Sequence, residues 1–232
     1  MIGFRILKRE RSVSPDIIAR FAKLPVANIS DMMARLTAGG PTIRPMHAPS
    51  APGSGVMAGP ALTVKSRPGD NLMLHKALDL AQAGDVIVCD GGGDLTNSLI
   101  GEIMLSIAVK KKLGGVVING SIRDSAWVRQ SPFPVFAAGV SHRGPYKDGP
   151  GEINVAIAMN GMVIEPGDLI IGDDDGFLCV PYDQCASVLA ATEAKQSAEV
   201  KTLADIAAGT LDRGWVDAAL KKLGCGGVCD SR

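Results

Sequence analysis

An arginine and an aspartate stand side by side at Arg123 and Asp124, directly after an apolar run of the sequence. An arginine guanidinium binds carboxylates through two parallel hydrogen bonds. A carboxylate beside an arginine stays ionised, and ionised carboxylate oxygens are hard ligands that suit Mg²⁺. The pair could therefore hold an anionic substrate and a metal ion together, although taken alone it is more often an ordinary surface ion pair.

A second segment with chemical potential is Gly101–Met104, which reads GEIM. The start of a helix presents unpaired backbone N–H groups and a partial positive charge, and a glycine there lets a ligand approach the backbone. We expect this segment to hold a carboxylate or an enolate oxygen. Many helices begin this way, so this segment alone is weak evidence. Twenty residues separate Glu102 from Arg123 and Asp124. Taken together, the three residues predict one site for an anion and a metal ion.

The elements that must position these residues lie between Gly84 and Asp124. The runs Asp85–Cys89 and Val116–Ile118 are short, rich in Val and Ile and bounded by Gly or Asp, which is typical of buried strands. Between them, Leu99–Leu113 has the apolar spacing of an amphipathic helix and ends in lysines. The sequence thus predicts strand, glycine-rich loop, helix, strand and a polar turn that carries the arginine and the aspartate.

The remaining elements follow from periodicity, turn residues and caps. Ser14 and Pro15 are typical of a helix start, and Gly209 of a helix end. Without an internal repeat or a long linker, we expect one α/β domain over residues 1–232. The expected helices are Ser14–Leu24, Ser30–Leu36, Asn71–Ala83, Ser125–Gln130, Tyr182–Ala208 and Trp215–Leu223; the expected strands are Ala58–Ser66, Val135–Val140, Ile153–Met159, Gly161–Ile164, Leu169–Ile171 and Phe177–Val180; Thr42–Val56 and Ser141–Gly151 are expected loops, the second at the rim of a site.

Composition excludes several classes of protein. Lys+Arg and Asp+Glu both number 24, and aromatic residues make up 4% of the chain, so neither a basic excess nor stacking rings favour nucleic-acid binding. No apolar run is long enough for a membrane span or a signal peptide. The five cysteines form no CxxC motif, and we expect a soluble, cytoplasmic protein. Cys89 and Cys179 lie in apolar runs and are expected in the core, whereas Cys225 and Cys229 indicate a glycine-rich tail more than a metal site.

Other motifs are weaker. The segment Asp173–Asp175 lacks the spacing of a calcium-binding EF-hand loop, and a solvated turn is the better interpretation. The glycines after Asp90 do not satisfy a dinucleotide-binding fingerprint, because Thr96 stands where its third glycine is required. The three histidines are far apart, and His75 is expected to be structural rather than a ligand.

Several segments taken together resemble the RraA-like proteins, which include aldolases acting on 4-hydroxy-4-methyl-2-oxoglutarate and 4-carboxy-4-hydroxy-2-oxoadipate. The resemblance extends from about Ser14 to Gly209. The segments that carry it are Ile29-Ser30-Asp31, Ala58-Gly59-Pro60-Ala61, Pro68-Gly69-Asp70-Asn71, Gly84-Asp85-Val86-Ile87-Val88, Gly101-Glu102, Gly114-Gly115-Val116-Val117-Ile118 and Asn119-Gly120-Ser121-Ile122-Arg123-Asp124.

The resemblance implies a compact three-layer β/β/α fold, similar to a swivelling domain, with flanking N- and C-terminal helices. Its core would span about residues 14–209 and its helical tail residues 210–232. It also implies homotrimers or homohexamers with the site near the subunit interface. Active members cleave 4-hydroxy-2-oxo acids to pyruvate by a divalent-metal (class II) route and decarboxylate oxaloacetate.

The resemblance also assigns roles to residues. Arg123 would bind substrate, Asp124 would hold Mg²⁺, Mn²⁺ or another divalent cation, and the amides of Gly101, Glu102, Ile103 and Met104 would bind the 2-oxo acid. The metal and the arginine would stabilise a pyruvate enolate. Glu102, together with Glu199 from a neighbouring subunit, would orient metal-bound waters for proton transfer, although Glu193 lies close to Glu199 in sequence.

One alternative belongs to a different class. The family's namesake inhibits ribonuclease E through protein–protein contact, so a non-catalytic regulator is the competing hypothesis. Retention of the loop together with the arginine and the aspartate favours an enzyme. The physiological substrate, the preferred metal, the general base and the choice between trimer and hexamer stay open.

Overall fold

The computed structural model describes residues 3–35, 40–48, 56–225 and 227. The chain separates into two units, Met1–Thr192 and Glu193–Arg232, and the boundary falls inside a long helix. The expectation of one domain over the whole chain stays a prediction. The described residues include no helix that is both long and apolar enough to cross a lipid bilayer.

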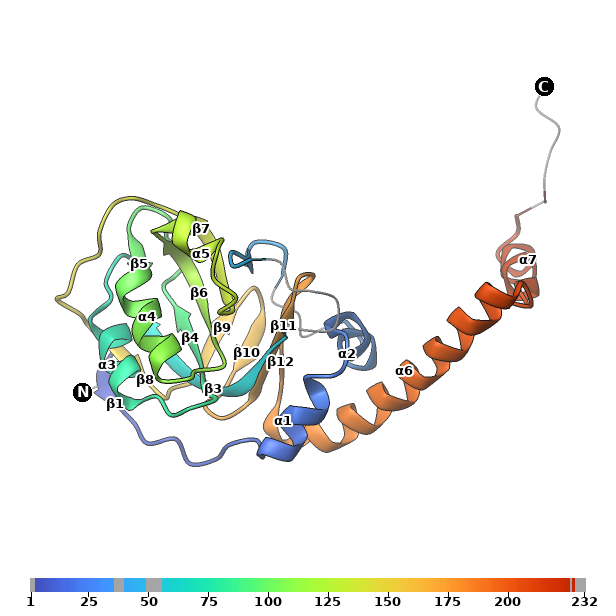
Figure 1. Ribbon diagram of the computed structural model, residues 1–232, viewed down its shortest axis with the longest axis horizontal. Helices are drawn as coiled ribbons and strands as arrows, with labels where there is room; N and C mark the ends of the chain where they lie inside the picture. Colours follow the sequence, from blue (N-terminus) through green and yellow to red (C-terminus); the bar gives the residue numbers. More distant parts are fainter. Residues whose placement is uncertain (1–2, 36–39, 49–55, 226, 228–232) are drawn as a thin grey trace, which may run out of the picture. The chain divides into compact units, whose positions relative to one another are not determined.

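Figure 1 shows the helices and strands of the chain. The strands are β1 (Phe4–Ile6), β2 (Arg44–Pro45), β3 (Met57–Ser66), β4 (Val86–Asp90), β5 (Ser98–Ile100), β6 (Gly115–Ile122), β7 (Val135–Val140), β8 (Gly151–Ile153), β9 (Ile157–Met159), β10 (Met162–Ile164), β11 (Leu169–Asp173) and β12 (Gly176–Val180). The helices are α1 (Pro15–Phe21), α2 (Val26–Met32), α3 (Leu72–Leu80), α4 (Glu102–Lys110), α5 (Ser125–Val128), the 3₁₀ turn η1 (Tyr182–Gln184), α6 (Cys185–Ala208) and α7 (Gly214–Lys222).

Four parallel strands, in the order β3-β4-β6-β7, form the middle of the main sheet. One row of paired residues crosses it: Val64 pairs with Cys89, Cys89 with Ile118, and Ile118 with Ala137. All four side chains are buried in the same core on the helical side of the sheet. Because parallel strands end at one edge of a sheet, the residues that follow β6 emerge beside those that follow β4 and β7.

Apolar side chains cover both faces of this sheet, as is usual for parallel strands. Helices α3 and α4 pack on one face, and the β9–β10 hairpin with β11 and β12 packs on the other (Figure 1). The adjacent residues Val116 and Val117 of β6 point into these two different cores. A third core lies between β11–β12 and α1, α2 and the first turns of α6. The mixed α/β fold with layered β and α elements is confirmed.

Several expected elements have the predicted position. Strand β7 has the predicted bounds, and the Ser14 side chain accepts a hydrogen bond from the Ile17 N–H at the start of α1. Gly209, at φ +71°, follows the end of α6. Cys89 and Cys179 lie in the core, where burial raises the pKa of Cys89 to about 12. These thiols are structural.

Three expected boundaries were wrong. The predicted helix from Leu99 begins only at Glu102, because Ser98–Ile100 pair with β6 as a strand and Gly101 stays extended. The predicted strand Ile153–Met159 is split into β8 and β9, because Asn154 turns the chain with a φ of +57°.

The second predicted helix, Ser30–Leu36, runs instead from Val26 to Met32. Pro25 was expected only to end the first helix, but it also occupies the N-cap of the second, a position that needs no free N–H. Leu36 lies outside the described residues, as do residues 49–55 of the expected loop Thr42–Val56, which also contains the short strand β2.

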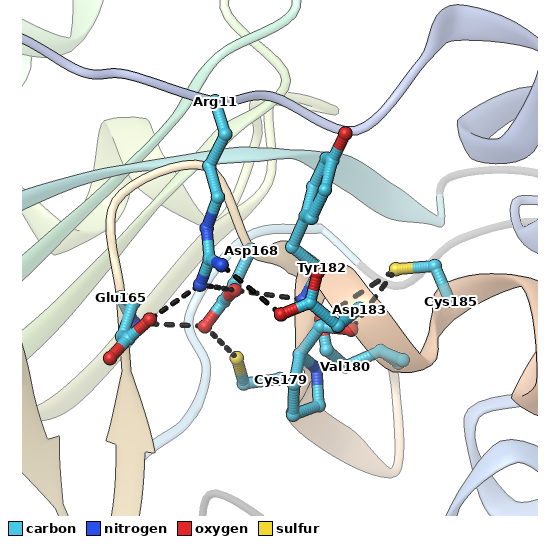
Figure 2. A network of polar contacts seen from close by, with 9 residues as sticks. Arg11, Glu165, Asp168, Cys179, Val180, Tyr182, Asp183 and Cys185 are labelled. Atoms are coloured by element: carbon cyan, nitrogen blue, oxygen red, sulfur yellow. Dashed lines mark hydrogen bonds and ion pairs between the residues drawn. The ribbon is translucent and has the colours of Figure 1, made fainter.

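A buried carboxylate, Asp168, joins the N-terminal segment to the turn before β11 and to the chain after β12 (Figure 2). The residue is 2% exposed, and its carboxylate accepts hydrogen bonds from the backbone N–H groups of Glu165 and Tyr182, each at 2.9 Å. The guanidinium of Arg11 lies 3.5 Å from the same carboxylate and also pairs with Glu165. This network holds three distant segments of the chain together.

Replacing Asp168 with alanine should lower the free energy of unfolding by roughly 2–4 kcal/mol, because two buried N–H groups lose their acceptor. Urea denaturation followed by circular dichroism measures this change. The matched control is Glu165→Ala, which removes a half-exposed partner of Arg11 and should cost less than about 1 kcal/mol. Equal losses in the two variants would contradict a central role for the buried carboxylate.

Candidate active site

Arg123 and Asp124 follow β6 directly, at the edge of the sheet where the parallel strands end. Strand β5 pairs with this end of β6, and the Arg123 N–H donates to the Ile100 carbonyl at 2.9 Å. The pairing places Gly101, the next residue of the chain, beside the arginine–aspartate pair. The structure thus brings together the two segments that the sequence placed in one site.

Gly101 lies so close to the pair that a larger residue would not fit. An added Cβ would lie 2.4 Å from Asp124 Oδ2 and 2.8 Å from Arg123 Cγ. The Glu102 N–H donates to Asp124 Oδ2 at 2.9 Å, so the carboxylate caps the start of α4. The absence of a side chain at Gly101 is what allows this contact.

The backbone of Asp124 is left-handed, with a φ of +57°. Its carbonyl accepts hydrogen bonds from the N–H groups of Trp127 and Val128, so it also begins α5. A non-glycine residue in this conformation is uncommon and occurs often at functional sites. Two helices therefore begin at this one residue, α4 at its side chain and α5 at its backbone.

A cavity of about 270 Å³ opens beside these residues. It lies among the end of β5, the first turn of α4, Arg123, the start of α3 and the 144–147 segment. The residues that line it are Asn71, His75, Ser98, Leu99, Ile100, Gly101, Ile103, Met104, Arg123, Gly144, Pro145 and Lys147.

The segment Ser141–Gly151 was expected to rim a site, and its residues Gly144, Pro145 and Lys147 do so. The N–H and the hydroxyl of Ser98 both donate to the Arg143 carbonyl at 2.9 Å, which fixes the segment against β5. An ideal Cβ on Gly144 would lie 3.5 Å from an Arg123 guanidinium nitrogen. The rim therefore limits the space around that guanidinium.

The predicted residues differ in how they face this cavity. Gly101, Ile103, Met104 and Arg123 line it, whereas Glu102 and Asp124 do not. The Glu102 N–H is already engaged by Asp124, which leaves the first-turn amides of Ile103 and Met104 as the groups with no carbonyl one turn earlier. Glu102 thus contributes its backbone to the aspartate rather than to the cavity.

The side chains of Arg123 and Asp124 are 43% and 40% exposed, and Arg123 Nε lies 3.7 Å from Asp124 Oδ2. Among the described residues, no group of three or more His, Cys, Asp or Glu side chains could enclose a metal ion. A single half-exposed carboxylate fits Mg²⁺, which keeps several waters and binds through one or two carboxylates plus substrate. Asp124 is thus suited to a cation that takes its other ligands from water and substrate.

Glu199, predicted to act from a neighbouring subunit, lies in the second unit, on α6. Its carboxylate forms an ion pair with Lys195, one helical turn earlier, with Lys195 Nζ 2.8 Å from Glu199 Oε1. Its catalytic role stays a prediction. Of the two tail cysteines, Cys225 is exposed and Cys229 lies outside the described residues.

The sequence analysis gave no role in the site to three polar residues that line the cavity. Asn71 was expected at the start of a helix and in a segment that carries the family resemblance, His75 was interpreted as structural, and Lys147 was expected only as part of the rim loop Ser141–Gly151. Burial lowers the pKa of His75, as does the positive charge of Lys147, while Asp79 acts in the opposite direction. The imidazole is therefore neutral near pH 7.

A family profile, described as RraA-like: Aldolase/RraA, matches residues 26–179, which include every residue of the cavity. The chain belongs to the RraA-like family. Within this family, the chain is 38% identical over 182 residues to a Halalkalibacterium halodurans protein named "Putative 4-hydroxy-4-methyl-2-oxoglutarate aldolase". The alignment covers 78% of this chain and 84% of that protein.

Two further relatives come from Thermus thermophilus. One is named 4-hydroxy-4-methyl-2-oxoglutarate aldolase and is 34% identical over 112 residues, 48% of this chain and 68% of that protein. The other is a solved structure, described as the RNA-processing inhibitor RraA, with a TM-score of 0.60 and 29% identity over 68% of this chain and 92% of its own. The RraA-like relatives thus include proteins named as an enzyme and as an inhibitor.

Replacing Gly101 with alanine should weaken Mn²⁺ binding about 10–100-fold, because the new Cβ would displace the carboxylate and break its contact with the Glu102 N–H. Isothermal titration calorimetry with MnCl₂ measures the affinity. Gly144→Ala is the matched control, since its Cβ would meet only an ordinary van der Waals contact. Unchanged Mn²⁺ affinity in Gly101→Ala would exclude Asp124 as the metal ligand.

Proposed function

We propose that the protein is a divalent-metal-dependent (class II) aldolase. It would cleave 4-hydroxy-2-oxo acids, such as 4-hydroxy-4-methyl-2-oxoglutarate, to pyruvate, and it would also decarboxylate oxaloacetate. The observation that carries the proposal is that Gly101, Arg123 and Asp124 lie close together, and that the first two of them line one small cavity. The names of two relatives support the same activity.

The reaction breaks the bond between C3 and C4 of the substrate. The 4-hydroxyl loses its proton, the C3–C4 electron pair stays on C3, and the product half is the enolate of pyruvate, which then takes a proton at C3. A guanidinium placed at the developing negative charge lowers the barrier. Arg123 lies in the cavity wall, and the first-turn amides of Ile103 and Met104 lie beside it. These groups can bind the carboxylate and the 2-oxo oxygen of the pyruvyl half.

Asp124 would hold the cation, with Oδ2 fixed by the Glu102 N–H. A bound divalent cation supplies Lewis-acid polarisation of the 2-oxo group. The donor set fits Mg²⁺ or Mn²⁺ because one carboxylate leaves positions for water and for a chelating 2-oxo acid.

Proton transfer needs a further group. We assign it to water held by Glu102 and by Glu199 of a neighbouring subunit, in a homotrimer or homohexamer whose active sites lie near the interfaces. The Glu102 side chain is exposed at the same edge of the sheet as Asp124, which suits a group that acts through solvent.

Arg123→Ala should lower kcat/KM for oxaloacetate decarboxylation about 10²–10³-fold, because the enolate loses a preorganised positive charge. Pyruvate release, coupled to lactate dehydrogenase and NADH oxidation, measures the rate. Arg129→Ala is the control, since Arg129 is exposed at the end of α5 and does not line the cavity. Decarboxylation at a near-native rate in Arg123→Ala would refute the role of the arginine.

The competing function is a non-catalytic regulator that binds a ribonuclease. The solved Thermus thermophilus relative, described as an RNA-processing inhibitor, favours it. Pyruvate release from oxaloacetate in the presence of Mg²⁺, abolished by EDTA, is expected of the enzyme. A purified protein that releases no pyruvate above the metal-only rate would favour the regulator.

A further inference from the structure

A buried asparagine, Asn97, lies just before β5 and is not among the residues that line the cavity. The residue is 6% exposed, and its Nδ2 donates to the Gly144 carbonyl at 2.5 Å. Because a carbonyl can only accept, this contact fixes the orientation of the side-chain amide. Ser98, the next residue of the chain, and Gly144 both line the cavity. Asn97 thus connects two parts of the cavity lining from behind.

Gly144 is the part of the rim that faces Arg123. A Cβ on this glycine would lie 3.5 Å from Arg123 Nη1, so the bare Cα is directed at the guanidinium. The Arg123 side chain is 43% exposed, and a long side chain keeps much of its rotamer freedom unless its neighbours restrict it. The position of the glycine therefore determines how far the guanidinium can move on this side.

Asn97 is itself held from two sides. Its N–H donates to Asp94 Oδ2 at 3.4 Å, within the loop that precedes β5. Its side chain lies against Gly69, where an added Cβ would be 3.3 Å from Asn97 Cβ and 3.4 Å from Oδ1. A hydrogen bond from the Thr96 hydroxyl lowers the pKa of Asp94, and the positive charge of Arg143 acts in the same direction, against desolvation. The carboxylate beside Asn97 therefore stays ionised and keeps its place as an acceptor.

The rest of the rim has its own anchors. The Tyr146 N–H donates to the Gly69 carbonyl at 2.9 Å. The Asp148 N–H donates at 2.7 Å to the carboxylate of Asp70, which is 1% exposed. Both anchors follow Gly144 in the chain, whereas the Asn97 amide bonds to the glycine itself. Asn97 thus controls a position that the other anchors leave free.

We propose that Asn97 is a positioning residue for Arg123. It touches neither substrate nor metal, and it acts by holding the Gly144 carbonyl so that the glycine stays against the guanidinium. The inference rests on the proposed function and adds a residue to it, because the position of the guanidinium affects the reaction only if Arg123 binds the substrate. A group that stabilises developing charge must be in place before the charge develops. Asn97 meets this requirement from outside the cavity.

The first test is a double-mutant cycle. Asn97→Asp keeps the shape of the side chain but replaces the donating NH₂ group with an oxygen that cannot donate when ionised. It should lower kcat/KM for oxaloacetate decarboxylation about 10–100-fold, the range expected when a catalytic group is misplaced by about 1 Å. In an Arg123→Ala background the same change should cost less than about threefold, because its effect passes through the arginine. Equal losses in the two backgrounds would overturn the proposal.

Ser141→Ala is the matched control. The Ser141 hydroxyl donates to the Thr96 carbonyl at 2.8 Å, so it joins the same two segments without bonding to Gly144. Its loss should leave kcat/KM within about threefold. A loss as large as that of Asn97→Asp would indicate a general loosening of the rim and would contradict a specific role for Asn97. If the charge introduced by Asn97→Asp unfolds the protein, Asn97→Ala, which removes the donor and adds no charge, is measured in the same cycle.

The second test does not depend on turnover. Oxalate is a planar dianion that resembles the enolate of pyruvate, and calorimetry with saturating Mg²⁺ measures its binding. Asn97→Asp should bind oxalate about tenfold more weakly than the native protein, while its affinity for Mn²⁺ without oxalate stays within about threefold, since Asp124 is untouched. Native oxalate affinity in the variant would overturn the role of Asn97 and leave the proposed function intact. A native protein that neither binds oxalate nor releases pyruvate would refute the proposed function, and the role of Asn97 with it.

Discussion

The site depends on one close approach between two chain segments. The Glu102 N–H donates to Asp124 Oδ2, and no side chain fits between them at Gly101. This contact caps α4 and holds the Asp124 carboxylate beside Gly101, 3.7 Å from Nε of the arginine that precedes it. A single missing Cβ thus lets the Asp124 carboxylate, the Arg123 guanidinium and the first amide of α4 lie together.

The rest of the first unit supports this contact. The residues of β5 come just before α4, but their pairing with the end of β6 keeps them extended, so that the helix begins only after Gly101. The core between the sheet and helices α3 and α4 holds both segments from below, with Leu99, Ile100 and Ile122 almost fully buried. The polar groups are therefore attached to well-packed segments. A site that acts through electrostatics needs such packing, because its charged groups and dipoles must already be in position when charge develops.

Much of this arrangement can be predicted from the sequence, and the exceptions have physical causes. The Val- and Ile-rich strands β4 and β6 and the Ser14 cap depend on local signals. Leu99 could not be assigned in this way, because its spacing from Ile103 and Ile107 matches a helix and only tertiary pairing makes it a strand. The joint part of Asn71 and Lys147 in the cavity could not be found either, since they are 76 positions apart in sequence and only the fold brings both to one cavity.

The most direct measurement is a crystal structure grown with MnCl₂ and pyruvate, with anomalous data that locate the manganese. The account predicts a manganese ion bound to the Asp124 carboxylate and to the pyruvate oxygens, with the pyruvate carboxylate against Arg123. Manganese bound away from Asp124, or pyruvate bound without contact to Arg123, would contradict it.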